Sequence, residues 1–246
     1  MINELREKFK CFEDPNFKFD PKWHKYTYNG KQYTSVTKFI SKFHKEFDQE
    51  YWSKKKSEEL DIDQEVLLKQ WKDKNDYANL VGHTTHDWIE GYFKKEYREL
   101  PTNIDIIERI NKFNKIYATH LFKLDPVKFE VRIFSKKYPI AGTIDSIFIY
   151  KGKLFCLDWK TNGKFTHDGF EGRYEKLLHP FEDFYKNHLN EYSIQVGLYA
   201  LILKEWGFDI RGGYLVHIGP DDEAKLYPCV DMVTILEKYL ESYIWN

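Results

Sequence analysis

The 246-residue sequence predicts an α/β protein in which helices flank a mixed β-sheet. Runs rich in β-branched and aromatic residues at 128–135, 141–150 and 153–161 are typical of consecutive strands. An apolar, buried helix at 193–206 and another strand at 212–219 follow them. Amphipathic helices are expected on both sides of these elements. Helices before, between and after the strands suit a sheet that is covered by helices.

The N-terminal part of the chain is predicted to begin with a β-hairpin. The dipeptide Asn29-Gly30 lies between two Tyr- and Thr-rich runs within residues 23–39, and it favours a two-residue turn. A polar helical stretch is expected to follow, up to about residue 80. The apolar spacing further predicts amphipathic helices at 83–98, 104–121 and 231–243.

The composition excludes several classes of protein. A formal net charge of −1 excludes a polycation that holds nucleic acid by charge alone. A hydrophobic content of 42% excludes a disordered polyelectrolyte. No run approaches the roughly 18 apolar residues of a membrane span. The three cysteines lie far apart and form no iron–sulfur set, so we expect a cytoplasmic protein of a bacterium or a phage-infected cell.

The chain is predicted to be a single domain over residues 1–246, because no flexible linker interrupts it. Residues 1–80 would form an N-terminal hairpin and helical elaboration. Residues 81–246 would form the core that carries the chemistry.

Residues 141–161 are predicted to form a β-hairpin around a turn at Lys151-Gly152. If the turn has two residues, Tyr150 faces Lys153. That pairing fixes the register of the whole hairpin.

In this register Asp145 lies directly across from Asp158, and Thr143 and Lys160 share their face. Opposed carboxylates repel each other, and apolar neighbours increase the cost. Bound Mg²⁺ or Mn²⁺ would remove it. Lys160 could orient or deprotonate a water, or stabilise charge on the phosphorane. The alternative is an exposed hairpin with two solvated acids.

Three further polar features mark candidate site residues. His86 and Glu90 lie one turn apart on the expected helix, as a metal ligand with a supporting group or as a hydrogen-bonded core pair. Gln195 and Tyr199 lie four apart on the apolar helix and need polar partners, from the protein or from a phosphate or base. Glu130 could supplement the metal ligands or pair with a basic residue. On spacing alone, His83 could replace His86.

These motifs together resemble a known superfamily. GTID (142–145), DWK (158–160), GHTTH (82–86) and QVGLY (195–199) are similar in order and spacing to the PD-(D/E)xK nucleases, and within them to the RecB-like exonuclease branch. TSVTKFI (34–40) also resembles phage exonucleases and the mitochondrial genome maintenance exonuclease.

The resemblance implies a restriction-endonuclease-like core, with a four-stranded mixed sheet flanked by helices. It implies a catalytic set of Asp145, Asp158 and Lys160. It implies Mg²⁺ or Mn²⁺ bound by His86, Asp145, Asp158 and the backbone carbonyl of Trp159. Substrate contacts would come from Gln195, Tyr199 and, on the carboxylates' face, Thr143. Glu90 and Glu130 would support these groups. Ile144 stands where the superfamily has proline, and the cysteines of its iron–sulfur members are absent, so no cluster is expected.

The expected function is therefore a metal-dependent DNA exonuclease that attacks single strands from a free end. Residues 22–56 carry nine lysines against three acids, interleaved with aromatic residues, which suits stacking on single-stranded DNA. Two alternatives stay open. One is an inactive nuclease-fold protein that binds nucleic acid or protein, and the other is an endonuclease of the same superfamily.

Overall fold

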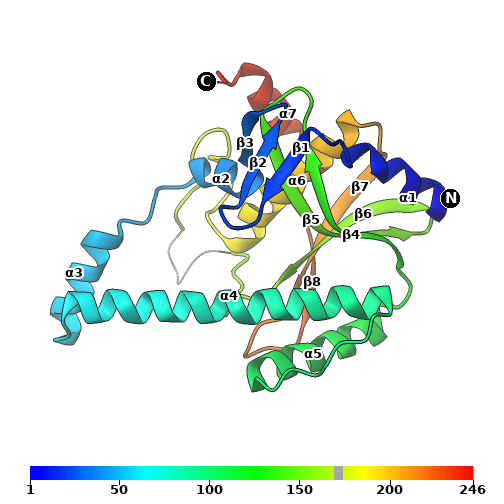
Figure 1. The fold of residues 1–246 in the computed structure, drawn as a ribbon. Coiled ribbons are helices and arrows are strands. Elements are labelled where there is room, and N and C mark those ends of the chain that lie inside the picture. The colour runs from blue at the N-terminus through cyan, green and yellow to red at the C-terminus, as the bar shows by residue number, and fades with distance from the viewer. Residues whose placement is uncertain (169–173, 246) are drawn as a thin grey trace.

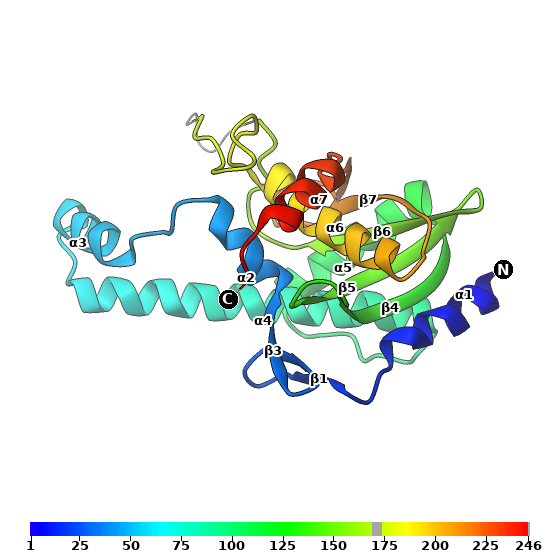
Figure 2. The same cartoon turned by 90° about the horizontal axis from the view of Figure 1, so that it is seen from above.

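The computed structural model describes residues 1–168 and 174–245. It has an α/β architecture in which helices flank a mixed sheet (Figures 1 and 2). Among the described residues the sheet has eight strands: β1 (Phe17–Asp20), β2 (Lys25–Tyr28), β3 (Lys31–Ser35), β4 (Asp125–Phe134), β5 (Ile140–Tyr150), β6 (Lys153–Lys160), β7 (Ile210–His217) and β8 (Lys225–Pro228).

The helices precede, connect and follow these strands. They are α1 (Ile2–Lys8), α2 (Val36–Ile40), α3 (Gln49–Leu60), α4 (Gln64–Lys94), α5 (Ile104–Ile116), α6 (His188–Glu205) and α7 (Val233–Ser242). Short 3-10 turns, η1 (Phe9–Phe12) and η2 (Ser41–Phe43), and a π turn, η3 (Tyr117–Leu121), extend them. No helix in the described ranges is long and apolar enough to span a membrane.

The strand order is β1-β2-β3-β5-β6-β7-β8, and β4 pairs with the other edge of β5. β5 is antiparallel to β4 and β6, whereas β6 and β7 are parallel and are connected by the crossover helix α6. The prediction of four strands is wrong. β1 to β3 join the sheet through only two residue pairs between β3 and β5, and β8 has four residues, so the sequence shows neither that the predicted N-terminal hairpin joins the sheet nor that β8 exists.

Both predicted hairpin turns are confirmed. Tyr28 pairs with Lys31 around Asn29-Gly30, and both turn residues have positive φ, 49° and 75°. Tight hairpins with this backbone favour Asn-Gly because glycine adopts positive φ without strain. The second hairpin shows the same φ signs at its two turn residues, and its register is described below.

Helices cover the two faces of the sheet, each over its own apolar cluster. On one face, Phe113 of α5 and Ile89 of α4 pack with Leu157 and Trp159 of β6. On the other face, Cys156 of β6 lies in the larger cluster, which includes α6 and α7. Alternation along β6 therefore directs its even-numbered side chains toward α6.

Helix α4 is longer than predicted. The sequence predicted a helix at 83–98, but α4 begins at Gln64, where the Asp63 side chain accepts hydrogen bonds from two backbone N–H groups, and it ends before Lys95 in the left-handed conformation. Residues 72–80 belong to the stretch expected as a separate polar helix, and they are exposed on every side, so no apolar stripe shows that the two segments form one helix. Figures 1 and 2 show this half extending away from the sheet, with α3 at its far end.

Candidate active site

A cavity of about 480 Å³ lies where α4, α6, the β1–β2 hairpin and strands β4 and β5 meet. Most of the sequence-predicted site residues line it. It is bounded by Phe19, His24, Tyr26, Ser35, Val36, Thr37, His83, His86, Asp87, Glu90, Glu130, Arg132, Gly142, Thr143, Asp145, Gln195 and Tyr199.

The cavity lies beside a gap in the sheet. β3 and β6 share one edge of β5: β3 pairs with its first two residues, and β6 pairs from Ser146 onward. Between them, residues 142–145 have no strand partner on that edge among the described pairs. At this gap the backbone N–H of Trp159 donates to Asp145 Oδ2 at 2.9 Å. The Asp145 side chain thus accepts a hydrogen bond from β6 at the point where the backbone pairing of β5 and β6 has ended.

The β5–β6 hairpin has the predicted register. Tyr150 faces Lys153 and Ser146 faces Leu157, and continuing this register places Asp145 opposite Asp158. Asp158 is almost fully buried, on the face that α6 covers. The two carboxyl groups are therefore brought to one place by the turn chemistry.

Asp158, Lys160, Gln195 and Tyr199 form a hydrogen-bonded chain beneath the cavity. Lys160 Nζ lies 2.8 Å from Asp158 Oδ2 and donates to Gln195 Oε1 at 3.3 Å. Gln195 Nε2 donates to Asp158 Oδ1 at 3.3 Å and to the Tyr199 hydroxyl at 2.8 Å. Lys160 Nζ also lies 4.0 Å from the centre of the Tyr192 ring. Sequence reasoning missed Tyr192, although it lies one helical turn before Gln195.

The ion pair between Asp158 and Lys160 determines the protonation state of both side chains. Burial raises the pKa of Asp158 to about 6, and the nearby charge of Asp145 adds to this rise. Burial works to lower the pKa of Lys160, but attraction to Asp158 outweighs it and the pKa is raised. At neutral pH the pair consists of a carboxylate and an ammonium, so Lys160 is a cation and not a free base.

His86, Glu130 and Asp145 form a second group at the cavity wall. One potential ligand atom from each lies within 4.8 Å of the others, and His86 Nδ1 is 3.7 Å from Asp145 Oδ2. Burial lowers the pKa of His86 to about 4, so the imidazole is neutral at pH 7. The Glu130 side chain is exposed at its edge, but partial burial of its carboxyl group, with the charges of Asp145 and Glu90, raises its pKa to about 8.

This grouping differs from the expected ligand set. Glu130, expected as a supporting group, lies with His86 and Asp145, whereas Asp158 is engaged by Lys160. Strand β4 turns irregularly at Glu130, whose φ is +46°, and the flanking pairs of β4 and β5 place it opposite Asp145. Spacing along the sequence gives no sign of this conformation. The backbone of Trp159 acts on His86 so as to oppose the lowering of its pKa.

Two glycines in the predicted motifs allow close packing here. A Cβ on Gly82 would lie 3.0 Å from Thr161 Oγ1, directly after Lys160, so α4 approaches the end of β6 closely. A Cβ on Gly142 would lie 2.8 Å from the Tyr199 ring. Both contacts are too short for a larger residue without movement of its neighbours. The absence of a side chain at these two glycines thus allows α4 and α6 to lie close to the site.

The remaining predicted residues lie at the edges of the cavity. Thr143 Oγ1 is 2.9 Å from the Tyr26 hydroxyl, a partner that the sequence did not predict. Glu90 is ion-paired with Lys94 one turn along α4. His83 is exposed at the rim, whereas His86 is half-buried.

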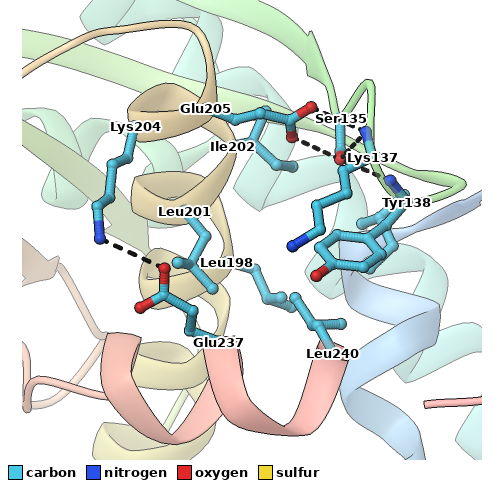
Figure 3. Close-up of a pocket in the computed structure, with 11 residues that line it drawn as sticks. Ser135, Lys137, Tyr138, Leu198, Leu201, Ile202, Lys204, Glu205, Glu237 and Leu240 are labelled. Carbon is cyan, nitrogen blue, oxygen red and sulfur yellow. Dashed lines mark hydrogen bonds and ion pairs between the residues drawn. The ribbon is translucent and has the colours of Figure 1, made fainter. Parts of the chain in front are cut away.

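A second cavity, of about 270 Å³, lies between α6, α7 and the β4–β5 turn (Figure 3). Its charged groups are already partnered. Lys204 pairs with Glu237 across the cavity, and Glu205 accepts hydrogen bonds from Ser135 and from the turn backbone. Leucine side chains form much of the remaining wall.

Comparison with known proteins gives a distant similarity to part of a RecB subunit. No known protein family matches the chain. The RecBCD enzyme subunit RecB of Buchnera aphidicola subsp. Baizongia pistaciae (strain Bp) is 26% identical over 72% of this chain, and the match spans 15% of that protein. A crystal structure of SSO0001 is 18% identical, covers 56% of this chain and 59% of its own, and has a TM-score of 0.28, too low to support an argument about fold. The chain is thus similar to a small part of a RecB subunit.

Proposed function

We propose that the protein is a metal-dependent nuclease that hydrolyses DNA, as an exonuclease acting on single strands from a free end. One observation carries this proposal: the group His86, Glu130 and Asp145 and the ion pair of Asp158 and Lys160 lie together beside one cavity. The similarity to RecB supports the same function class.

The donor set suits a divalent cation. Two carboxylates and a neutral imidazole within 4.8 Å supply oxygen and nitrogen ligands compatible with Mn²⁺ or Mg²⁺. Burial raises the pKa of Asp145, which shows that its charge is costly without a cation. His86, Glu130 and Asp145 would hold the ion, and the backbone carbonyl of Trp159 is a further candidate. A bound ion would polarise the phosphate and lower the pKa of a coordinated water.

The other groups would act around the scissile phosphate. Lys160 is held as a cation by Asp158, so it would stabilise negative charge that develops on the phosphate oxygens and would not remove a proton. Gln195 bridges Lys160, Asp158 and Tyr199 and would keep the lysine in place. Thr143 and Tyr199 line the same cavity and are the nearest candidates for contacts to the strand.

The preference for single strands rests on the N-terminal half. Trp23 and Tyr51 expose 63% and 55% of their surface among lysines, so both can stack on unpaired bases. Tyr26, Phe39 and Phe43 are buried and belong to the core. Stacking faces near cations hold single strands without reading their sequence.

Digestion of labelled DNA tests the proposal. Linear single-stranded, linear duplex and circular single-stranded substrates are incubated with Mg²⁺ or Mn²⁺, with Asp145→Asn as the inactive control. We expect rapid loss of the linear single strand only. Rapid cleavage of the circle would replace the exonuclease with an endonuclease. Absence of cleavage with retained DNA binding would identify a binding protein.

A further inference from the structure

Arg132 is exceptional among the arginines of this chain. Of those that the structure describes, Arg6 and Arg109 donate to backbone carbonyls, and Arg98 and Arg211 pair with carboxylates. Arg132 has no hydrogen bond or ion pair within the described part of the chain. Its guanidinium lies over the Phe19 ring, 4.9 Å from the ring centre. Its N–H donors are thus left available.

The surroundings of Arg132 hold it in place. Phe19 contacts His24 edge-on at 5.2 Å and Tyr26 at 4.7 Å, and the Tyr26 hydroxyl bonds to Thr143. Arg132 itself pairs with Thr143 across β4 and β5. A guanidinium stacked on an aromatic ring keeps its edge free for bidentate hydrogen bonds. The aromatic group of the β1–β2 hairpin thus presents a fixed, unpaired cation.

This cation shares the cavity with the candidate metal ligands. Arg132 follows Glu130 by two residues on β4, and both line the cavity with His86 and Asp145. Phe19 and His24, which contact each other, form the wall on the hairpin side. A strand whose scissile phosphate lies at His86 and Asp145 would meet Arg132 toward this wall. The planar fork of arginine matches a phosphate group.

We propose that Arg132 binds the phosphate at the end of the substrate strand, on the side of the nucleotide that is released. This rests on the proposed nuclease function. Phe19, His24 and Tyr26 of the β1–β2 hairpin line the cavity on the same side as Arg132, so the strand would end against the hairpin with its terminal phosphate at Arg132. Arg132 is a substrate-binding residue that distinguishes a phosphorylated end from a hydroxyl end.

Binding of short fluorescent oligonucleotides tests this site without cleavage. Single strands carrying a phosphate at the 5′ end, at the 3′ end or at neither end are titrated in EDTA and in Ca²⁺ and followed by anisotropy. We expect one phosphorylated strand to bind roughly tenfold more tightly than the hydroxyl-ended strand, as expected for one charge-assisted contact. Arg132→Gln should abolish the difference, and Arg132→Lys should retain part of it.

Two variants serve as controls. Arg211→Gln removes an exposed arginine that pairs with Asp209 outside the cavity, so it should keep the preference. Phe19→Leu removes the ring beneath Arg132 and should weaken the preference. Thermal unfolding confirms that each variant is folded. Equal binding of all three strands by the native protein, or a preference that survives Arg132→Gln, would overturn the proposal.

Failure of the nuclease function would give a different result. If the native protein cleaves no substrate in Mg²⁺ or Mn²⁺, the nuclease proposal falls, but an Arg132-dependent preference measured in EDTA stands. If cleavage occurs, Arg132→Gln should raise KM for the phosphorylated strand about tenfold and leave KM for the hydroxyl-ended strand unchanged. An equal rise for both strands would contradict the assignment to the terminal phosphate.

Discussion

The two acids brought together by the β5–β6 hairpin are stabilised in different ways. Asp158 is almost fully buried and paired with Lys160, whereas Asp145 retains 17% side-chain exposure and accepts from the Trp159 backbone. Removing one partner of a buried ion pair leaves an uncompensated charge, while removing one of two repelling acids does not. Substitutions at these positions should therefore have unequal effects on stability.

Asp145→Asn and Asp158→Asn should both abolish cleavage, but only the second should destabilise the metal-free protein. We expect Asp158→Asn to lower the free energy of unfolding by roughly 3 kcal/mol, because Lys160 loses its carboxylate. Asp145→Asn should leave stability unchanged or raised. Urea unfolding in EDTA measures both effects. The double variant Asp158→Asn with Lys160→Met should recover stability, and equal losses in the two single variants would contradict this account.

Lys160→Ala should lower the cleavage rate by at least roughly 10²-fold, the usual effect of removing a stabiliser of transition-state charge. DNA binding should persist, because the lysine is mostly buried and its contribution is to the transition state. Single-turnover cleavage and anisotropy separate the two effects. Lys160→Arg is the matched control that keeps the charge, and a Lys160→Ala protein with near-normal turnover would remove the lysine from the mechanism.

The carboxyl group of Glu130 should make the stability of the metal-free protein depend on pH. Its pKa is about 8 in the folded state and near 4.5 when unfolded, so between these values the folded state binds more protons. The contribution of Glu130 to the free energy of unfolding is therefore complete below pH 4.5, and this contribution is lost as the pH rises through 8. Urea midpoints of the native protein and of Glu130→Gln are measured from pH 6 to 9 in EDTA. We expect the midpoint of the variant to depend less on pH than the midpoint of the native protein. Parallel profiles would contradict the shift.

Residue positions could be predicted where they depend on local geometry. The Lys151-Gly152 turn fixed the register that brings Asp145 and Asp158 together. Glu130 was predicted as a supporting group, but its place directly beside His86 was not, because β4 bends at Glu130. Arg132 was not predicted as a site residue, because a contact between a strand and a remote aromatic ring has no local pattern.

At the scale of elements, α4 combines two environments in one helix. Its C-terminal half packs on the sheet through Ile89 and carries His86, while residues 72–80 of its N-terminal half are exposed to solvent. The packed half was predicted from its apolar stripe. The exposed half was expected as a separate polar helical stretch, because a polar segment has no stripe that shows it to be continuous with the packed half. For the same reason the short strands β1 and β8 were missed: four residues are too few for a periodic pattern.

The position of each histidine on α4 predicts the effect of its replacement. His86→Ala should weaken metal binding, so that activity falls at low Mn²⁺ and partly recovers at high Mn²⁺. His83 is exposed at the rim, and His83→Ala should have a milder effect. Cleavage rates across a Mn²⁺ titration measure this, with thermal unfolding as the control. Equal defects in both variants that follow lost stability would instead indicate a structural role.

At the scale of the whole molecule, the net charge limits the grip on DNA. The 38 Lys and Arg residues are balanced by 39 Asp and Glu residues, so the net electrostatic attraction to the strand is weak. The slope of log affinity against log salt for single strands is about −0.7 for each phosphate contacted. We therefore expect a shallow slope, of about −2, in anisotropy titrations over KCl. A slope of about −5 or steeper would show an extensive basic surface and contradict this view.

The exposed half of α4 also gives the molecule a mechanical property. From Gln64 to Leu80 the helix extends for about 25 Å, and from its first buried contact with the core at Val81 to His86 it runs for about 8 Å. Because the helix is continuous, a tilt of its exposed half about Val81 would be transmitted to His86. A tilt that moves α3 by 3 Å moves His86 by about 1 Å, a displacement that can cost a catalytic site about 10²-fold in rate. A displacement of α3 would therefore reach His86 reduced about threefold, to a size that matters for the position of a metal ligand.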